Sequence, residues 1–244
     1  FCLVICLINP HDVLGCPGLP SAIPGANGTY IEGGYFGTEL SSPWSEQTGS
    51  LAIAVPPTAP EDLTANLKPL CQPAFAQTLT GLGPIPTDGL KLKYLNFYGN
   101  LLKLNDRRLS KMLDLLDGVD GTFIPAAATA LRDDTWIIFT SDHGDMATTH
   151  GGLRQKSFVV YEEVLNIPLI WSNPVDHPTP GVCNELVSHV DFVPTLCSVL
   201  GVNTAAYNLK GVDYSSLITN PAGPAVQDSL LFTFDDVWCG QNAG

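Results

Sequence analysis

The composition of this 244-residue chain excludes a disordered segment, because 45% of its residues are hydrophobic and only 14% are charged. Eleven Lys and Arg against 24 Asp and Glu give a formal net charge of −13, which repels polyanions and argues against a nucleic-acid scaffold. No apolar run reaches the roughly 18 residues that a membrane-spanning helix needs. Because of its net negative charge, the protein could hold an anionic substrate only through a metal ion or a few focused cations.

The first segment, FCLVICLI (residues 1–8), has the pattern of a buried strand in a parallel sheet. Because a central strand is an unusual place for a domain to begin, we expect a fragment whose upstream strands are missing, with a natural N-terminal edge strand as the alternative. Residues 13–60 come next and are rich in Gly, Pro and Ser. So long a connection without regular structure is typical of a binding or lid region, and we expect substrate-side loops there.

Residues 88–117 are predicted to form one long amphipathic helix, or two helices with a kink. Their apolar residues recur at three- and four-residue intervals, as in Tyr94, Tyr98, Leu101 and Leu102. The helix should end at Gly118 or Gly121, because glycine is favoured just past a helix C-terminus. An alanine-rich stretch, PAAATALRDD, then leads into a predicted strand at 135–140.

The C-terminal half continues the alternation of strands and helices. YEEVL predicts a helical turn, IPLIW a buried strand, residues 190–200 a helix with Pro194 in its first turn, and LLFTF a last strand. This order is typical of a layered α/β fold, which we expect to form a single domain over residues 1–244.

Two of the predicted strands run into similar polar segments. LVICLI is followed by Asn-Pro-His11-Asp, and WIIFT by Ser-Asp142-His143-Gly144-Asp. Ligands of open α/β sheets bind at the carboxyl ends of the strands. Asp142 offers a carboxylate and His143 an imidazole, a pair suited to a divalent metal, while Gly144 lets the backbone turn sharply. The alternative is an ordinary polar turn in which Asp142 caps the residues after it.

Two further polar residues lie beyond this segment. His150 lies in THGG, and Lys156, six residues later, could bind an anionic group beside the metal. Taken singly, Lys156 is as well explained as a solvated surface lysine, His150 as a loop histidine, and His11 as a residue that satisfies local backbone groups.

Their ordered combination is more specific. The block SDHGDMATTHGGLRQKSFVVYEEVLNIPLIW closely resembles the sulfatase family of the alkaline-phosphatase superfamily. NPHD, PPTAPEDLTANLKP, the helix with Asn105-Asp106-Arg107, and VSHVDFVPTLCSVLGV also resemble family segments, so nearly the whole chain finds a place. The resemblance implies a layered α/β/α sandwich with a mostly parallel central sheet, alkaline-phosphatase-like and incomplete at the N-terminus.

The same resemblance implies roles for four residues. Asp142 and His143 would be ligands of a divalent metal, for which the family usually uses calcium. Lys156 and His11 would contact the sulfate and the leaving-group oxygen, and either could be the general acid. Two departures stand out: Asn166 replaces the usual Arg before Ile-Pro, and the upstream paired metal-binding aspartates have no counterpart.

The nucleophile that the resemblance implies is also missing from this chain. In the family it is a formylglycine made from Cys or Ser in C-x-P-x-R or S-x-P-x-R, and none of the seven cysteines here lies in such a motif. We therefore expect the formylglycine upstream and expect residues 1–244 alone to be inactive.

Three hypotheses of function remain. The first is a sulfatase that hydrolyses a small-molecule or carbohydrate sulfate ester. The second is a phosphodiesterase or phosphonate monoester hydrolase of the same superfamily, and the third is a noncatalytic binding protein on this fold. Family resemblance favours a periplasmic or secreted location.

Overall fold

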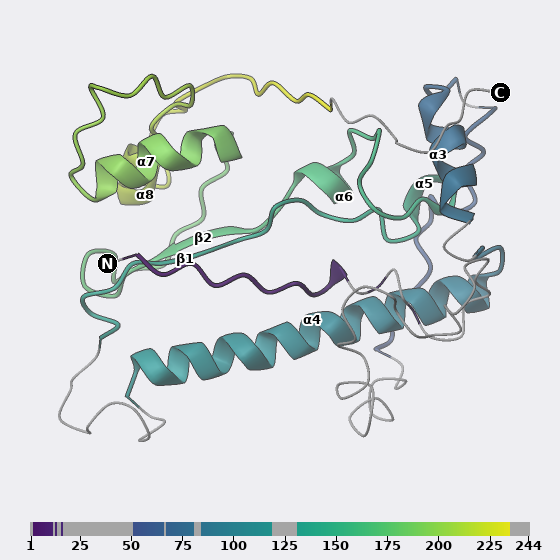
Figure 1. The fold of residues 1–244 in the computed structure, drawn as a ribbon, viewed down its shortest axis with the longest axis horizontal. Coiled ribbons are helices and arrows are strands. Elements are labelled where there is room, and N and C mark those ends of the chain that lie inside the picture. The colour runs from purple at the N-terminus through teal and green to yellow at the C-terminus, as the bar shows by residue number, and fades with distance from the viewer. Residues whose placement is uncertain are drawn as a thin grey trace. The chain divides into compact units, whose positions relative to one another are not determined.

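The computed structural model describes residues 2–11, 13, 16, 51–65, 67–80, 84–118 and 131–234. The chain divides into two compact units: unit 1 comprises Phe1–Thr129 and Ser141–Pro168, and unit 2 comprises Ala130–Thr140 and Leu169–Gly244. Figure 1 labels the helices and strands of the chain. In chain order the elements are α3 (Cys71–Leu79), α4 (Asp88–Leu116), β1 (Ile137–Thr140), α5 (Thr149–Gly152), α6 (Glu162–Leu165), β2 (Leu169–Ser172), η3 (His189–Asp191), α7 (Phe192–Val199) and α8 (Ser215–Thr219). Within the described ranges, no helix combines the length and the apolar character needed to cross a membrane.

Helix α4 confirms the long helix predicted at 88–117, as one continuous helix of 29 residues. Its start is capped by Thr87, whose hydroxyl accepts a hydrogen bond from the Leu90 amide at 3.3 Å. Its end is marked by Gly118, whose φ of 69° lies in the left-handed region that glycine adopts without strain. The helix packs its apolar face into a first core of unit 1, which consists of Val13, Cys16, Ile85, Tyr94, Phe97 and Leu101.

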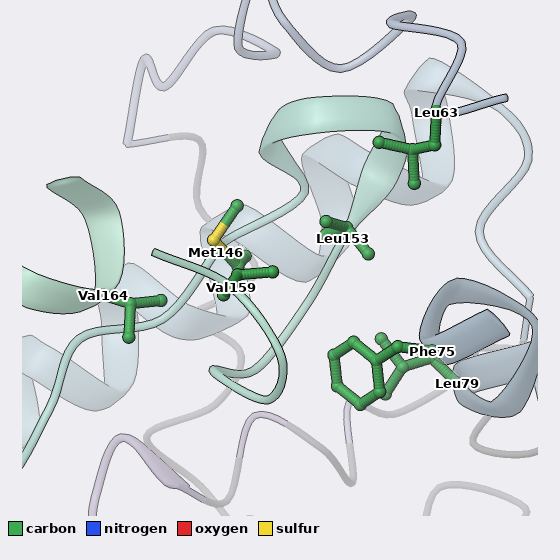
Figure 2. Packing of buried hydrophobic residues seen from close by; sticks show 7 residues of the cluster. All are labelled: Leu63, Phe75, Leu79, Met146, Leu153, Val159 and Val164. Carbon is green, nitrogen blue, oxygen red and sulfur yellow. The ribbon is translucent and has the colours of Figure 1, made fainter. Parts of the chain in front are cut away.

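A second core of unit 1 holds the segment that carries His150 and Lys156. It consists of Leu63, Phe75, Leu79, Met146, Leu153, Val159 and Val164 (Figure 2). Phe75 and Leu79 come from α3, and Phe75 also meets Phe158 edge to face at a centroid distance of 5.8 Å. Full burial of each such side chain contributes about 1.5–3 kcal/mol, so this core anchors residues 146–164 to α3.

Unit 2 contains the strand pair. β1 and β2 occupy the predicted strand segments and pair with Ile137 opposite Ser172 and Thr140 opposite Leu169. The pair is antiparallel, so the mostly parallel sheet is not confirmed. Residues 141–168, which contain the short helices α5 and α6, are long enough to join either parallel or antiparallel neighbours, so the order of the elements alone does not determine the direction of pairing.

The buried strand predicted at residues 1–8 is wrong for the part that the structure describes. Residues 2–8 form no strand, and Leu3, Val4 and Ile5 are 71%, 77% and 52% exposed. A run of apolar residues shows a capacity for burial, but a strand also needs a hydrogen-bonding neighbour, and none of the described residues pairs with this segment. The strand predicted at LLFTF is wrong for the same reason, since the described residues there form none.

The two other helices predicted from the sequence are both present. YEEVL contains α6, and the predicted helix at 190–200 is α7, preceded by η3 and followed by Gly201 with a φ of 65°. Most of the loop region 13–60 and most of the alanine-rich stretch lie outside the described residues. The single domain over 1–244 stays a prediction.

Candidate active site

Asp142 and His143 follow β1 after one residue, Ser141, and their side chains face each other. The Asp142 Oδ1 atom accepts a hydrogen bond from the His143 amide at 3.0 Å, and its Oδ2 atom lies 3.2 Å from His143 Nε2. The other ring nitrogen, Nδ1, lies 2.7 Å from the Gly144 carbonyl oxygen, which can only accept a hydrogen bond. In the tautomer that carries its proton on Nδ1, the imidazole donates to the Gly144 carbonyl, and Nε2 and the Asp142 carboxylate can face the same cation.

This pair fits a divalent cation as part of its coordination shell. The Asp142 side chain is 83% exposed, so its carboxylate is accessible to an ion from solution. A metal-binding histidine characteristically donates its second ring nitrogen to a carbonyl, as His143 does to Gly144. Calcium takes about six to eight oxygen ligands, and within the part of the chain that the structure describes no group of three or more potential ligands is assembled. Asp142 and His143 can thus supply only part of such a shell.

Gly144 is required here by close approach. Its amide donates to the Val164 carbonyl at 2.9 Å, which holds the loop against α6. A Cβ atom on Gly144 would lie 1.9 Å from the Glu163 carbonyl oxygen, far inside van der Waals contact. The sequence correctly indicated that a glycine was needed, but the reason is packing against Glu163.

Asp145 connects the candidate metal-binding loop to the loop of Lys156. Its half-buried carboxylate accepts hydrogen bonds from the amides of Ala147 at 2.7 Å and Gln155 at 3.1 Å, and from Gln155 Nε2 at 3.3 Å. In return, the Gln155 carbonyl accepts from the Met146 amide at 2.9 Å. Burial raises the pKa of Asp145, while these donors and the nearby Arg154 act in the opposite direction. Sequence reasoning gave Asp145 no role, although its place beside Asp142 and His143 was visible.

Lys156 follows Gln155 in a tight, half-buried turn. Gln155 and Phe158 have φ values of 66° and 61°, an uncommon conformation for residues other than glycine. Such a backbone persists only where the surroundings hold it, and here Asp145 holds Gln155 while the second core holds the chain around Phe158. Lys156 therefore lies in a turn that its neighbours hold in place.

His150 lies between two carboxylates. Its Nδ1 is 2.8 Å from Glu61 Oε2, its Nε2 is 3.4 Å from Glu163 Oε1, and its ring stacks on Tyr161 with a centroid distance of 3.9 Å. This environment is more specific than that of an ordinary loop histidine. Glu61, Tyr161 and Glu163 were not singled out from the sequence, although the resembling segments contain all three.

His11 lies in the turn after residues 2–8. Its amide donates to the Ile8 carbonyl at 3.1 Å, and the side-chain amide of Asn105 in α4 donates to the Asn9 carbonyl. The structure places His11, Asp142, His143 and Lys156 in unit 1 and brings Asp142 against His143. The convergence of His11 and Lys156 on that pair stays a prediction.

Residues 91–202 match the family model of the sulfatases. The chain is 33% identical over 148 residues to an uncharacterized sulfatase, YidJ, of Escherichia coli K12, a match that covers 58% of this chain and 25% of that protein. It is 34% identical over 124 residues to human arylsulfatase A, covering 48% and 24% of the two chains. The chain thus spans about a quarter of the length of these relatives.

Two solved structures show the same fold as this chain. A putative sulfatase from Bacteroides thetaiotaomicron superposes with a TM-score of 0.56 over 90% of this chain and 41% of the other, at 17% identity. A 2-O GAG sulfatase gives a TM-score of 0.53 over 86% and 40%, also at 17% identity. The observed elements therefore represent part of the alkaline-phosphatase-like fold of those proteins.

Proposed function

Since this chain belongs to the sulfatase family, we propose that the full-length protein hydrolyses a sulfate ester with Asp142, His143, His11 and Lys156 at its active site. The observation that carries the proposal is the arrangement of Asp142 and His143, whose carboxylate and imidazole nitrogen lie 3.2 Å apart shortly after β1. This arrangement lies within the residues that match the family model.

The proposed roles derive from the charge that develops in the reaction. When the bond between sulfur and the ester oxygen breaks, negative charge grows on the departing oxygen and on the sulfuryl oxygens. Asp142 and His143 would hold a divalent ion, calcium by family resemblance, which supplies electrostatic stabilisation when bound. Lys156 would contact the sulfate, and either Lys156 or His11 would give a proton to the leaving oxygen.

The rest of the active site would come from the remainder of the protein. By family resemblance, the attacking group is a formylglycine upstream of this chain, so residues 1–244 alone would be inactive. We expect a small-molecule or carbohydrate sulfate ester as the substrate, because the relatives include a choline-sulfatase of Rhizobium meliloti and an ulvan-active sulfatase of Formosa agariphila. A periplasmic or secreted location also remains a proposal.

The test uses the full-length protein and its Lys156→Ala and Lys156→Arg variants. Assays with p-nitrophenyl sulfate, p-nitrophenyl phosphate, bis-p-nitrophenyl phosphate and a phenylphosphonate monoester separate the sulfatase from the other hydrolases of the superfamily. We expect sulfate turnover, and a loss of about 100-fold to 10,000-fold in kcat for Lys156→Ala if this lysine is the general acid. Turnover of phosphate or phosphonate esters alone would contradict the proposal, and so would binding of sulfate esters without turnover.

A further inference from the structure

The loop that carries Lys156 is closed at its base by two stacked rings. His150 precedes Lys156 by six residues and Tyr161 follows it by five. The two rings lie nearly parallel, at 9°, with a centroid distance of 3.9 Å. The stack therefore joins the two ends of a short loop whose middle holds the candidate substrate-binding lysine.

Charged and polar groups from the segment before α3 and from the first turn of α3 hold this stack in place. Glu61 contacts His150 Nδ1 at 2.8 Å through one carboxylate oxygen and Lys68 Nζ at 3.0 Å through the other. Lys68 also donates to the Tyr161 hydroxyl at 2.9 Å, and this hydroxyl donates to Gln72 Oε1 at 3.0 Å. The side chains of His150, Glu61 and Lys68 are only 17–21% exposed, so solvent weakens these contacts less than it would on an open surface.

The backbone at the base of the loop is tied to the same segment. The amides of His150 and Gly151 donate to the hydroxyl and the carbonyl of Thr58, at 3.2 Å and 3.1 Å. Gly151 has a φ of 74°, and a Cβ atom there would lie 2.7 Å from the Leu63 side chain and 2.8 Å from the Glu61 carbonyl oxygen. We call Thr58, Glu61, Lys68, His150 and Tyr161 together the His150 clamp.

The middle of the loop is attached to the candidate metal-binding loop instead. Gln155, directly before Lys156, is hydrogen-bonded to Asp145 and Met146. Leu153 and Val159 are fully buried in the second core, one on each side of the turn. The backbone that carries Lys156 is thus held from two sides, by the His150 clamp at the base of the loop and by Asp145, which contacts the neighbouring Gln155.

We propose that the His150 clamp positions Lys156, and that Glu61, His150 and Tyr161 are positioning residues for the reaction. The consequence for catalysis rests on the proposed function, whereas the effect on Lys156 itself does not. A side chain that acts on a small anion must be placed within about 1 Å, and errors of that size cost up to about 100-fold in rate. A purely structural role for these residues would lower stability without a specific effect on Lys156.

The first test measures the reactivity of Lys156 in the full-length protein, by brief acetylation and mass spectrometry of the peptide that contains it. Tyr161→Phe keeps the stacked ring and loses the hydroxyl contacts, Tyr161→Leu loses both, and Glu61→Gln removes the charge between His150 and Lys68. Phe97→Leu, in the first core of unit 1, is a control for a general loss of stability.

We expect labelling of the half-buried Lys156 to rise about threefold or more in Tyr161→Leu and Glu61→Gln, less in Tyr161→Phe, and not in Phe97→Leu, because only the clamp variants open this loop. Unchanged labelling in the clamp variants would overturn the proposal. An equal rise in Phe97→Leu would do the same.

The second test asks whether Tyr161 acts through Lys156. We expect kcat/KM for p-nitrophenyl sulfate to fall about tenfold or more in Tyr161→Leu, and we expect this loss to disappear in the Lys156→Ala background, because a positioning residue has no effect once its target is removed. Equal losses in both backgrounds would contradict the positioning role. If the full-length protein hydrolyses no sulfate ester, the proposed function fails, and the labelling result still decides whether the clamp positions Lys156.

Discussion

The close approach of Gly144 to Glu163 predicts a large loss of stability for Gly144→Ala. The added methyl carbon would lie 1.9 Å from the Glu163 carbonyl oxygen, 2.9 Å from its carbonyl carbon and 3.2 Å from Val164 Cα. All three atoms belong to the backbone, so no side-chain rotation can relieve the overlap. The loop must move away from α6 and lose the hydrogen bond from the Gly144 amide to Val164.

The expected magnitude is the sum of two effects. Overpacking of a tight site costs about 1–3 kcal/mol, and the lost hydrogen bond costs about 0.5–1.5 kcal/mol, so Gly144→Ala should lower the free energy of unfolding by roughly 2–4 kcal/mol. Urea denaturation followed by circular dichroism measures this change. The matched control is Gly89→Ala in the first turn of α4, where the nearest atom would lie 4.0 Å from the new Cβ and the protein should gain up to about 1 kcal/mol. A Gly144→Ala protein as stable as the unsubstituted one would refute this explanation of the loop.

Two further predictions concern the titratable groups Cys16 and Asp145. Cys16 should resist iodoacetamide at about pH 8.5 while the exposed Cys2 and Cys6 react. Desolvation raises the pKa of the Cys16 thiol to about 12, so little of it is thiolate at that pH. Alkylation of Cys16 as fast as of Cys2, measured by mass spectrometry, would contradict the burial of Cys16. Burial also raises the pKa of Asp145 above its ordinary value of 3.8, so the folded state favours the protonated carboxyl. The stability that the protonated carboxyl contributes is lost as the pH rises from 3.8 through the raised pKa. Asp145→Asn should remove this pH dependence of the free energy of unfolding. Parallel curves of that free energy for the unsubstituted protein and the variant between about pH 3 and 7 would contradict the raised pKa of Asp145.

Local patterns in the sequence predicted α4, α6 and α7, whereas α3 and α8 were not predicted. The periodic apolar residues of 88–117, with Thr87 before them and Gly118 after them, contain nearly all that determines α4. The same holds for α7, where Pro194 and Gly201 mark the two ends. Strands depend on partners elsewhere, and the apolar run at 1–8 could not show whether a neighbour was present.

The candidate site was predictable only in part for a similar reason. Asp142 and His143 are adjacent in the sequence, so their proximity is a consequence of the motif itself. The contacts of His150 with Glu61 and of Asp145 with Gln155 join residues that are distant along the chain or that lie beyond a turn, and they depend on the packing of the second core. A single sequence contains no direct signal for such pairs.

The most direct test of the proposed active site compares the full-length protein with its Asp142→Asn variant over a range of calcium concentrations, by melting temperature and by turnover of p-nitrophenyl sulfate. If Asp142 only caps the turn through the His143 amide, Asn should replace it at a cost of about 1 kcal/mol or less, and calcium should affect both proteins equally. If Asp142 is a metal ligand, the unsubstituted protein should gain melting temperature with calcium, because the ion binds the folded state. The variant should then gain less, with calcium affinity and turnover lowered together by about tenfold or more. Coincident calcium curves for the two proteins would contradict the assignment of Asp142 as a metal ligand.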